Sequence, residues 1–186
     1  MGEPACQLQL FQDLPLVVHD RDQRSPELPA LSFEVIRSSR RRKTVQARLV
    51  NGVVEIRIPA AMSAAEERRW VNDMLSRFER SLRSAHIDLP ERAASLARRY
   101  GLPEPANIRW VDNMTTRWGS CTIDDSTIRI CSETAEFPRW VLDYIIVHEL
   151  AHLVEANHSK AFWTLVGRYP KTERARGFLI ARGLDG

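Results

Sequence analysis

Three of the five histidines of the chain lie within eleven residues, His148-Glu149-Leu150-Ala151-His152-Leu153-Val154-Glu155-Ala156-Asn157-His158. On a helix, His148 and His152 lie one turn apart, so both rings leave the same face and can reach a single Zn²⁺ at about 2.0–2.1 Å. Glu149 lies beside that face, where a carboxylate can accept a proton from a metal-bound water, as in the H-E-x-x-H arrangement. The segment therefore predicts a hydrolytic zinc site with Glu149 as its general base.

The third histidine can supply a third ligand if the chain turns back after His152. Asn157 tolerates the left-handed conformation, so it can end the helix near residue 156 and bring His158 to the metal. Three imidazoles leave the fourth tetrahedral position to water, and this open position distinguishes a catalytic zinc site from a structural one. We therefore expect one Zn²⁺ per chain, held by His148, His152 and His158.

The helix that carries this motif is predicted to begin at Pro138 and to be buried on nearly every side. Apolar residues cover almost its whole circumference, which places a helix in the middle of a domain. Histidine and glutamate in such a helix carry a desolvation cost unless a metal and water satisfy them. A further carboxylate is expected to orient one imidazole, and Glu155 and Asp143 are both open candidates. The apolar positions are Trp140, Val141, Leu142, Tyr144, Ile145, Ile146, Val147, Leu150, Leu153 and Val154.

Composition and charge indicate an ordinary globular protein. The chain has 186 residues, of which 44% are hydrophobic and 27% charged, and this length suffices for one sizeable core. The three cysteines form no disulfide framework, and the N-terminus lacks the pattern of a secretory signal. No apolar run approaches the roughly 20 residues of a membrane span. We therefore expect a cytoplasmic protein with no membrane segment, whose oligomeric state the sequence leaves open.

The order of the predicted elements indicates an α+β fold. Strands and a hairpin are expected at residues 31–60, helices at 63–101, strands at 107–132, and the active-site and C-terminal helices at 138–186. Prolines and polar residues interrupt residues 1–30, which we expect to form a flexible tail. The sequence therefore predicts a single domain over residues 31–186, with an antiparallel or mixed sheet packed on helices around a buried central helix.

A β-hairpin is predicted at residues 44–58. Asn51-Gly52 is the strongest two-residue turn signal, because a type I′ turn needs positive φ at both centres. The register that this turn imposes places Arg48 opposite Glu55 as a cross-strand pair of opposite charge. A strand before the hairpin is expected to bury one face, formed by Leu31, Phe33 and Val35.

Local signals also mark where three helices begin. A capping box formed by Ser63 and Glu66 starts the helix after the hairpin. Asp88 is expected to cap the next helix, which Gly101 ends. Ser159 is expected to cap the helix that follows the histidine segment.

The segment Arg117-Trp118-Gly119-Ser120-Cys121 lies in a predicted pair of strands over residues 117–123 and 127–131. A glycine inside a strand indicates that another group approaches the backbone closely. An edge strand beside the zinc helix can bind a peptide by β-augmentation, with residues 117–120 in contact with it. The alternative is that Trp118 packs in the core and Gly119 makes room for it. Candidate donors for a substrate oxyanion are Arg117, Tyr144 and Tyr169.

A basic segment lies between the first strand and the hairpin, Arg37-Ser38-Ser39-Arg40-Arg41-Arg42-Lys43, with five positive charges in seven residues. Such a cluster can contact the phosphates of a nucleotide or nucleic acid, or an acidic partner. The alternative is a solvated loop, which we favour because no aromatic residue is interleaved to stack on a base.

Three motifs together resemble the YgjP-like metallopeptidase-domain family, which is related to the SprT-like proteins and minigluzincins. They are Arg117–Cys121, His148–His152 and the segment Asn157-His158-Ser159-Lys160-Ala161-Phe162-Trp163, and the resemblance covers roughly residues 31–180. The resemblance implies a compact zincin-like domain with zinc ligands at His148, His152 and His158 and a catalytic Glu149. It leaves the substrate undefined.

Three functions are compatible with these patterns. We favour a zinc metallopeptidase that acts on a peptide or protein, in which water activated by Glu149 attacks a peptide carbonyl. The first alternative is a zinc hydrolase of a nucleotide or phosphoanhydride, with the basic segment Arg37–Lys43 binding phosphate. The second is a zinc-containing, nucleic-acid-associated binding module. Glu149 argues against the binding module, because a closed structural site needs no base.

Overall fold

The chain divides into two compact units with the boundary after Leu82, and each is described by itself. The computed structural model describes residues 7–8 and 31–183. Most of the predicted tail lies outside the described residues, although β1 (Gln7–Leu8) within it forms a short strand. The single domain predicted over residues 31–186 spans both units.

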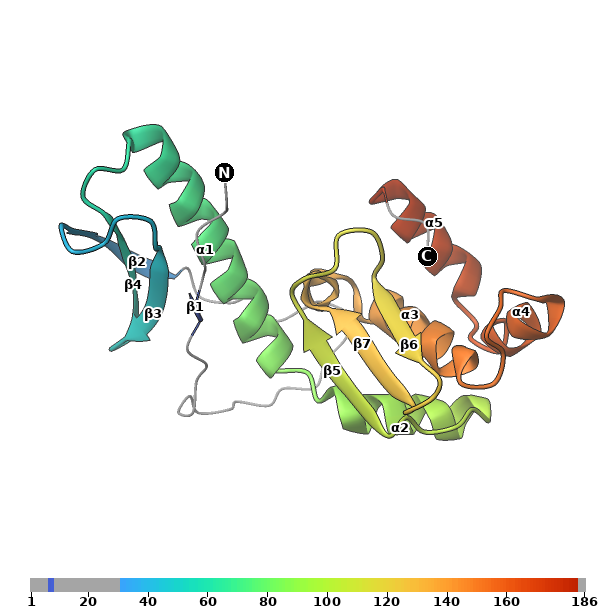
Figure 1. The fold of residues 1–186 in the computed structure, drawn as a ribbon. Helices are drawn as coiled ribbons and strands as arrows, with labels where there is room; N and C mark the ends of the chain where they lie inside the picture. The colour runs from blue at the N-terminus through green and yellow to red at the C-terminus, as the bar shows by residue number, and fades with distance from the viewer. Residues whose placement is uncertain (1–6, 9–30, 184–186) are drawn as a thin grey trace. The chain divides into compact units, whose positions relative to one another are not determined.

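The first unit is a four-stranded mixed sheet covered by one long helix (Figure 1, blue to green). Its strand order is β1-β3-β4-β2. β3 (Gln46–Val50) and β4 (Val53–Pro59) are antiparallel, and β2 (Ser32–Ser38) runs parallel to β4 at the edge of the sheet. Helix α1 (Ala64–Ala85) buries Val71, Met74 and Phe78 against β3 and β4, so the core of this unit lies between helix and sheet.

The predicted hairpin is confirmed in both turn and register. Asn51 and Gly52 have φ values of 51° and 81°, as a type I′ turn requires. Arg48 pairs with Glu55 across the two strands, and its guanidinium lies 2.8 Å from the Glu55 carboxylate. The turn chemistry and the charge pattern therefore select the same pairing.

The prediction that the first strand buries Phe33 is wrong, because 49% of the surface of this residue is exposed. The core is centred on β3 and β4, and the edge strand reaches it only through the partly buried Leu31 and Val35. Alternation in sequence predicts the strand but not its place in the sheet, and an edge position leaves part of the strand uncovered.

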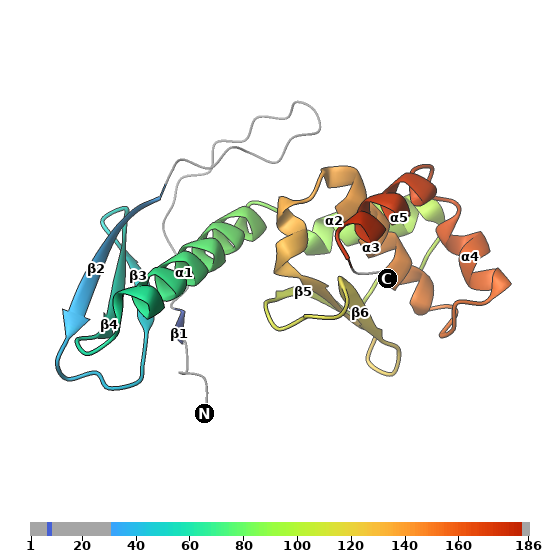
Figure 2. The same ribbon diagram turned by 90° about the horizontal axis from the view of Figure 1, so that it is seen from above.

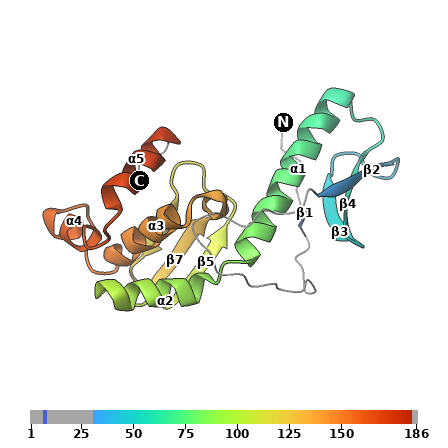
Figure 3. The ribbon, with the colours of Figure 1, turned by 180° about the vertical axis from the view of Figure 1, so that it is seen from behind.

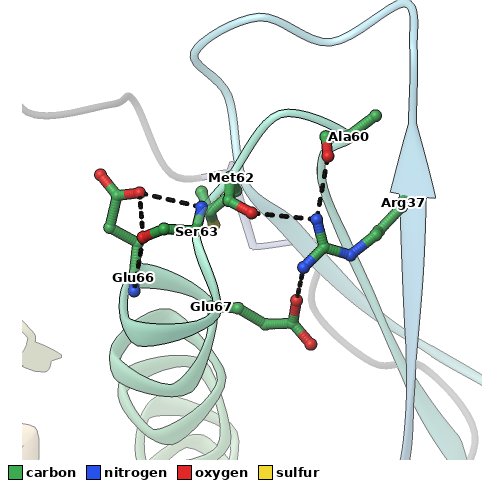
Figure 4. Close-up of polar contacts among 6 residues, drawn as sticks. All are labelled: Arg37, Ala60, Met62, Ser63, Glu66 and Glu67. Atoms are coloured by element: carbon green, nitrogen blue, oxygen red, sulfur yellow. Dashed lines mark hydrogen bonds and ion pairs between the residues drawn. The ribbon is translucent and has the colours of Figure 1, made fainter.

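Arg37 joins β2 to the start of α1 (Figure 4). Its guanidinium donates hydrogen bonds to the backbone carbonyls of Ala60 and Met62, both at 2.9 Å, and pairs with the carboxylate of Glu67. The first member of the basic segment Arg37–Lys43 is therefore engaged by contacts within its own unit.

The predicted caps of α1 and α2 are confirmed. The Ser63 N–H donates to the Glu66 carboxylate at 3.1 Å, and the Glu66 N–H donates to Ser63 Oγ at 3.3 Å, which completes a capping box (Figure 4). Helix α2 (Leu89–Tyr100) begins at Asp88, whose carboxylate accepts a hydrogen bond from the Glu91 N–H at 3.0 Å, and it ends at Gly101. Local sequence thus decides these boundaries.

The second unit is a three-stranded sheet with α2, α3 and α5 on one side of it (Figures 2 and 3). Its strand order is β5-β7-β6, so β6 forms one edge. β5 (Asn107–Val111) is parallel to β7 (Thr127–Cys131), and β6 (Gly119–Thr122) is antiparallel to β7, which confirms the predicted strand pair. The remaining elements are the 3-10 helix η1 (Ser132–Glu136), α3 (Arg139–His152), α4 (Lys160–Val166) and α5 (Thr172–Ala181).

Helix α3 lies at the centre of this unit, in contact with α2, α4, α5, β6 and β7. Residues 141, 142 and 144–151 are buried, which confirms the predicted central helix. Val154 does not belong to its buried surface: the helix ends at His152, and Val154 is 53% exposed in the loop that follows. Asp143, on α3, forms an ion pair with Arg92 of α2.

The described residues hold five α-helices and two small mixed sheets, which confirms the α+β class. None of the helices in this part of the chain combines the length and the apolar character needed to cross a membrane.

The hairpin turn can be tested at Gly52, where an added Cβ would meet nothing within 4 Å. The only cost of a side chain here is then the positive φ, which is unfavourable for any residue with a Cβ. Gly52→Ala should therefore lower the free energy of unfolding by about 1 kcal/mol. In the control Gly177→Ala, within α5, the added Cβ also meets nothing, and helix propensity should raise stability by about 0.5–1 kcal/mol. Urea unfolding measures both. Equal stability of Gly52→Ala and the parent would contradict the type I′ turn.

Candidate metal centre

The three histidines of the motif converge on one point. His148 and His152 lie on the last two turns of α3, and His158 lies in the loop between α3 and α4. One ligand nitrogen from each ring lies within 4.8 Å of the other two, and the Nε2 atoms of His148 and His158 are 3.1 Å apart. The residues that the sequence predicts as metal ligands are therefore brought together.

The donor set fits a zinc ion. Tetrahedral ligands at the usual Zn–N distance lie about 3.3 Å from one another, close to the separation between His148 and His158. Burial, together with the neighbouring His152 and His158, lowers the pKa of His148 to about 3, and burial also lowers the pKa of His152. The two rings on α3 are therefore neutral near pH 7, the state in which an imidazole nitrogen can bind a metal.

The loop that brings His158 to the centre differs from the prediction. Helix α3 ends at His152 rather than near residue 156, and Asn157 is not left-handed: among the described non-glycine residues only Asn51 and Ser126 have positive φ. The backbone N–H groups of Val154 and Glu155 instead donate to the Ala151 carbonyl at 3.0 and 2.9 Å. Right-handed turns thus satisfy the end of the helix, and no left-handed residue is needed.

Glu155 orients His152, but through its backbone. His152 Nδ1 lies 3.0 Å from the Glu155 carbonyl oxygen, which can only accept, so Nδ1 carries the proton and Nε2 is left with its lone pair. The Glu155 side chain accepts a hydrogen bond from Ser159 Oγ at 3.2 Å. Asp143, the other candidate, is occupied by Arg92. A backbone contact of this kind has no sequence signal, because every residue has a carbonyl.

Glu149 packs directly against the backbone of Gly119 on β6. A Cβ at Gly119 would lie 2.5 Å from Glu149 Oε1 and 2.9 Å from its Cγ and Cδ atoms. The glycine therefore makes room for the carboxylate: the sequence predicted a close approach to the backbone here, but not that the approaching group is Glu149. Burial raises the pKa of Glu149 to about 8, partly opposed by the positive charge of Arg117. A carboxyl group with such a pKa is suited to proton transfer near neutral pH.

Trp118 belongs to the core of the second unit. Its ring packs edge-to-face on Phe137 with centroids 5.0 Å apart, and it is buried. The residue also lines the cleft that contains the three histidines. Core packing was the expected alternative for this residue, and the structure supports it.

A cleft of about 360 Å³ surrounds the histidines and Glu149. Of the residues predicted to bind substrate, Arg117, Trp118, Gly119 and Ser120 line it. Ser120 is engaged by Arg129, whose Nε donates to Ser120 Oγ at 3.1 Å. Several further lining residues come from β6, α3, α5 and loops, and one of them, Tyr144, was predicted as a donor for a substrate oxyanion. They are Cys121, Ile123, Tyr144, Ile145, Ala156 and Leu179.

Tyr169 is not among the residues that line this cleft. Its hydroxyl donates to the Trp140 carbonyl at 2.8 Å, and its ring packs edge-to-face on Tyr100. The side chain borders a separate hollow next to Trp163 and Arg176. The structure therefore does not place Tyr169 where it could contact a substrate oxyanion, whereas Arg117 and Tyr144 do reach the cleft.

Comparison with known proteins identifies one family. The family model described as "YgjP-like, metallopeptidase domain" matches residues 37–180. No curated protein matches the chain. Two solved structures are similar to parts of it. The metallopeptidase zymogen abylysin of Pyrococcus abyssi has 19% identity and a TM-score of 0.45, over 50% of this chain and 92% of that one. The metallopeptidase zymogen jannalysin of Methanocaldococcus jannaschii has 22% identity and a TM-score of 0.45, over 52% of this chain and 97% of that one.

The contact between Gly119 and Glu149 can be tested by a double-mutant cycle. Gly119→Ala should lower the free energy of unfolding by about 1–3 kcal/mol, because the added methyl group would overpack the buried side chain of Glu149. In a Glu149→Ala background the opposing atoms are gone, so the same change should cost much less. Urea unfolding of the four proteins measures the coupling. An equal cost in both backgrounds would show that the two residues do not touch.

Proposed function

The chain belongs to the YgjP-like metallopeptidase family, and we propose that it is a zinc-dependent peptidase that hydrolyses a peptide or protein substrate. The observation that carries the proposal is the convergence of His148, His152 and His158 in one cleft with the buried carboxylate of Glu149. A site that only held a metal for structural reasons would have no use for an acidic side chain buried at this place.

Each residue of the centre has a separate role in the proposed reaction. The three histidines hold one Zn²⁺ per chain, which when bound supplies a Lewis acid that polarises a carbonyl and lowers the pKa of a water molecule. Glu149 would accept a proton from a water molecule in the cleft and later deliver it to the leaving amine. Gly119 allows the carboxylate to lie against β6, close to where a substrate backbone would run.

Strand β6 offers a place for the substrate. It lies at the edge of its sheet and, among the described residues, pairs only with β7. An extended peptide can add to such an edge through backbone hydrogen bonds, which give affinity with little dependence on sequence. Arg117 is exposed at the cleft and is the cation that acts on Glu149. We propose that it also stabilises the negative charge that develops on the substrate carbonyl oxygen.

Glu149→Gln tests the proposed base. Glutamine keeps the shape of the side chain but cannot accept the proton, so kcat/KM should fall by at least about 10²-fold while the zinc content stays near one per chain. Glu136→Gln, an exposed change on η1, is the control and should match wild type. Metal analysis and hydrolysis of a peptide library measure the two properties. Unchanged turnover of every wild-type substrate by Glu149→Gln would rule out this role.

The same library screen can include nucleoside triphosphates. Turnover of nucleotides alone, sensitive to Glu149→Gln, would replace the peptidase by the alternative hydrolase at the same centre.

Metal removal tests the proposed ligands independently of activity. Free Zn²⁺ at 100 times its dissociation constant should add about 2.7 kcal/mol to the free energy of unfolding of metal-free protein. His158→Ala should abolish most of this gain, whereas His86→Ala, at an exposed histidine outside the cleft, should leave it intact. Thermal unfolding with and without Zn²⁺ measures the gain. Full stabilisation of His158→Ala would exclude His158 as a ligand.

A further inference from the structure

One aromatic ring lies against all three histidines. Phe162, on α4, is fully buried, and its ring centroid lies 4.9 Å from that of His148, 4.4 Å from that of His152 and 4.6 Å from that of His158. It stacks on His152 at 30° and meets the other two rings edge-to-face, at 77° and 79°. Both arrangements are favourable for aromatic rings, so Phe162 restricts the orientation of each imidazole.

The histidines need such a restraint to different degrees. A metal-binding imidazole usually donates its second N–H to a carboxylate or carbonyl, which fixes its orientation. His152 has this contact with the Glu155 carbonyl. His148 lacks it: its Nδ1 is buried and has no hydrogen-bond partner within the described part of the chain. The orientation of His148 therefore depends on packing against Phe162, Tyr144 and Trp163, whose ring centroids lie 4.9, 5.9 and 6.2 Å from its own, with Phe162 the nearest of the three.

Hydrogen bonds tie Phe162 to the loop that carries the ligands. The Phe162 N–H donates to Ser159 Oγ at 3.2 Å, which caps α4 as the sequence predicts. Ser159 Oγ in turn donates to the Glu155 carboxylate at 3.2 Å, and the backbone carbonyl of Glu155 holds His152. A single connected segment thus places the aromatic ring and orients one of the imidazoles that it touches.

We propose that Phe162 is a positioning residue for the metal centre: its ring sets the three imidazoles in a metal-binding arrangement before the ion arrives, and so determines the affinity for metal. The role rests on the proposed zinc site. Phe162 touches neither the metal nor the substrate in this account, so it acts only through the histidines.

Phe162→Leu tests the role by a direct measurement of metal binding. Zn²⁺ affinity, measured by competition with a chromophoric chelator, should fall about 10- to 100-fold, the usual effect of losing a group that orients a ligand. The absorption spectrum of the Co²⁺-substituted protein should change as well, because it reports ligand geometry. Phe162→Met, which has nearly the volume of leucine on a longer, unbranched side chain, should give a loss in the same direction and serves if the leucine variant does not fold.

Val166→Ala is the matched control. Val166 lies on the same helix and is fully buried, and none of the ring contacts to the histidines involves it. It should destabilise the protein while leaving the Zn²⁺ affinity and the Co²⁺ spectrum as in wild type.

Three results would overturn the role of Phe162. Unchanged affinity in Phe162→Leu and Phe162→Met would show that the ring does not position the ligands. An equal loss of affinity in Val166→Ala would show a general effect of core packing. Wild-type protein that binds Zn²⁺ no better than His158→Ala would remove the metal centre itself, and the positioning role with it. The third result is distinguishable from the first two, because in those His158→Ala still abolishes binding.

Discussion

Two polar side chains on α3 lose their contact with water when the second unit folds. The rest of this unit has to compensate for the free-energy cost of that loss. His148 and Glu149 are buried on a helix whose other buried positions are almost all apolar. Burial favours their neutral forms, and it moves the pKa of His148 down to about 3 and that of Glu149 up to about 8. Such groups are costly unless something compensates for the lost water. In the proposed function, a metal ion and water bound in the cleft beside the helix would provide that compensation.

Two segments from different parts of the chain complete the cleft around α3. Strand β6 contributes Gly119, and the absence of a side chain there lets the Glu149 carboxylate lie directly against the backbone. The loop after α3 contributes His158, and α4 adds the ring of Phe162 beneath all three imidazoles. In the proposed function the two sides would have different tasks: β6 would bind the substrate and position the base, and α4 would position the metal ligands.

Much of this arrangement can be predicted from sequence wherever the signal is local. The turn at Asn51-Gly52 and the caps at Ser63, Asp88 and Ser159 depend on residues within four positions of one another, and they lie where expected. The spacing of His148, Glu149 and His152 likewise needs only the geometry of one helix. Predictions that depend on tertiary placement fared less well. Phe33 was expected to be buried but is exposed, and α3 was expected to end near residue 156 but ends at His152. Tyr169 was expected to contact a substrate but lies outside the cleft. The contact between Gly119 and Glu149 joins positions 30 residues apart, and no periodicity encodes it.

The proposed function requires a metal held by three imidazoles with one open position, next to a base that does not coordinate it. X-ray absorption at the zinc edge of the purified protein tests this most directly. A three-histidine site should give nitrogen and oxygen neighbours at about 2.0–2.1 Å, with the multiple-scattering pattern of three imidazole rings and one further light atom. Cys121 lies in the same cleft. A sulfur neighbour at about 2.3 Å would therefore show a thiolate ligand and contradict the three-histidine site.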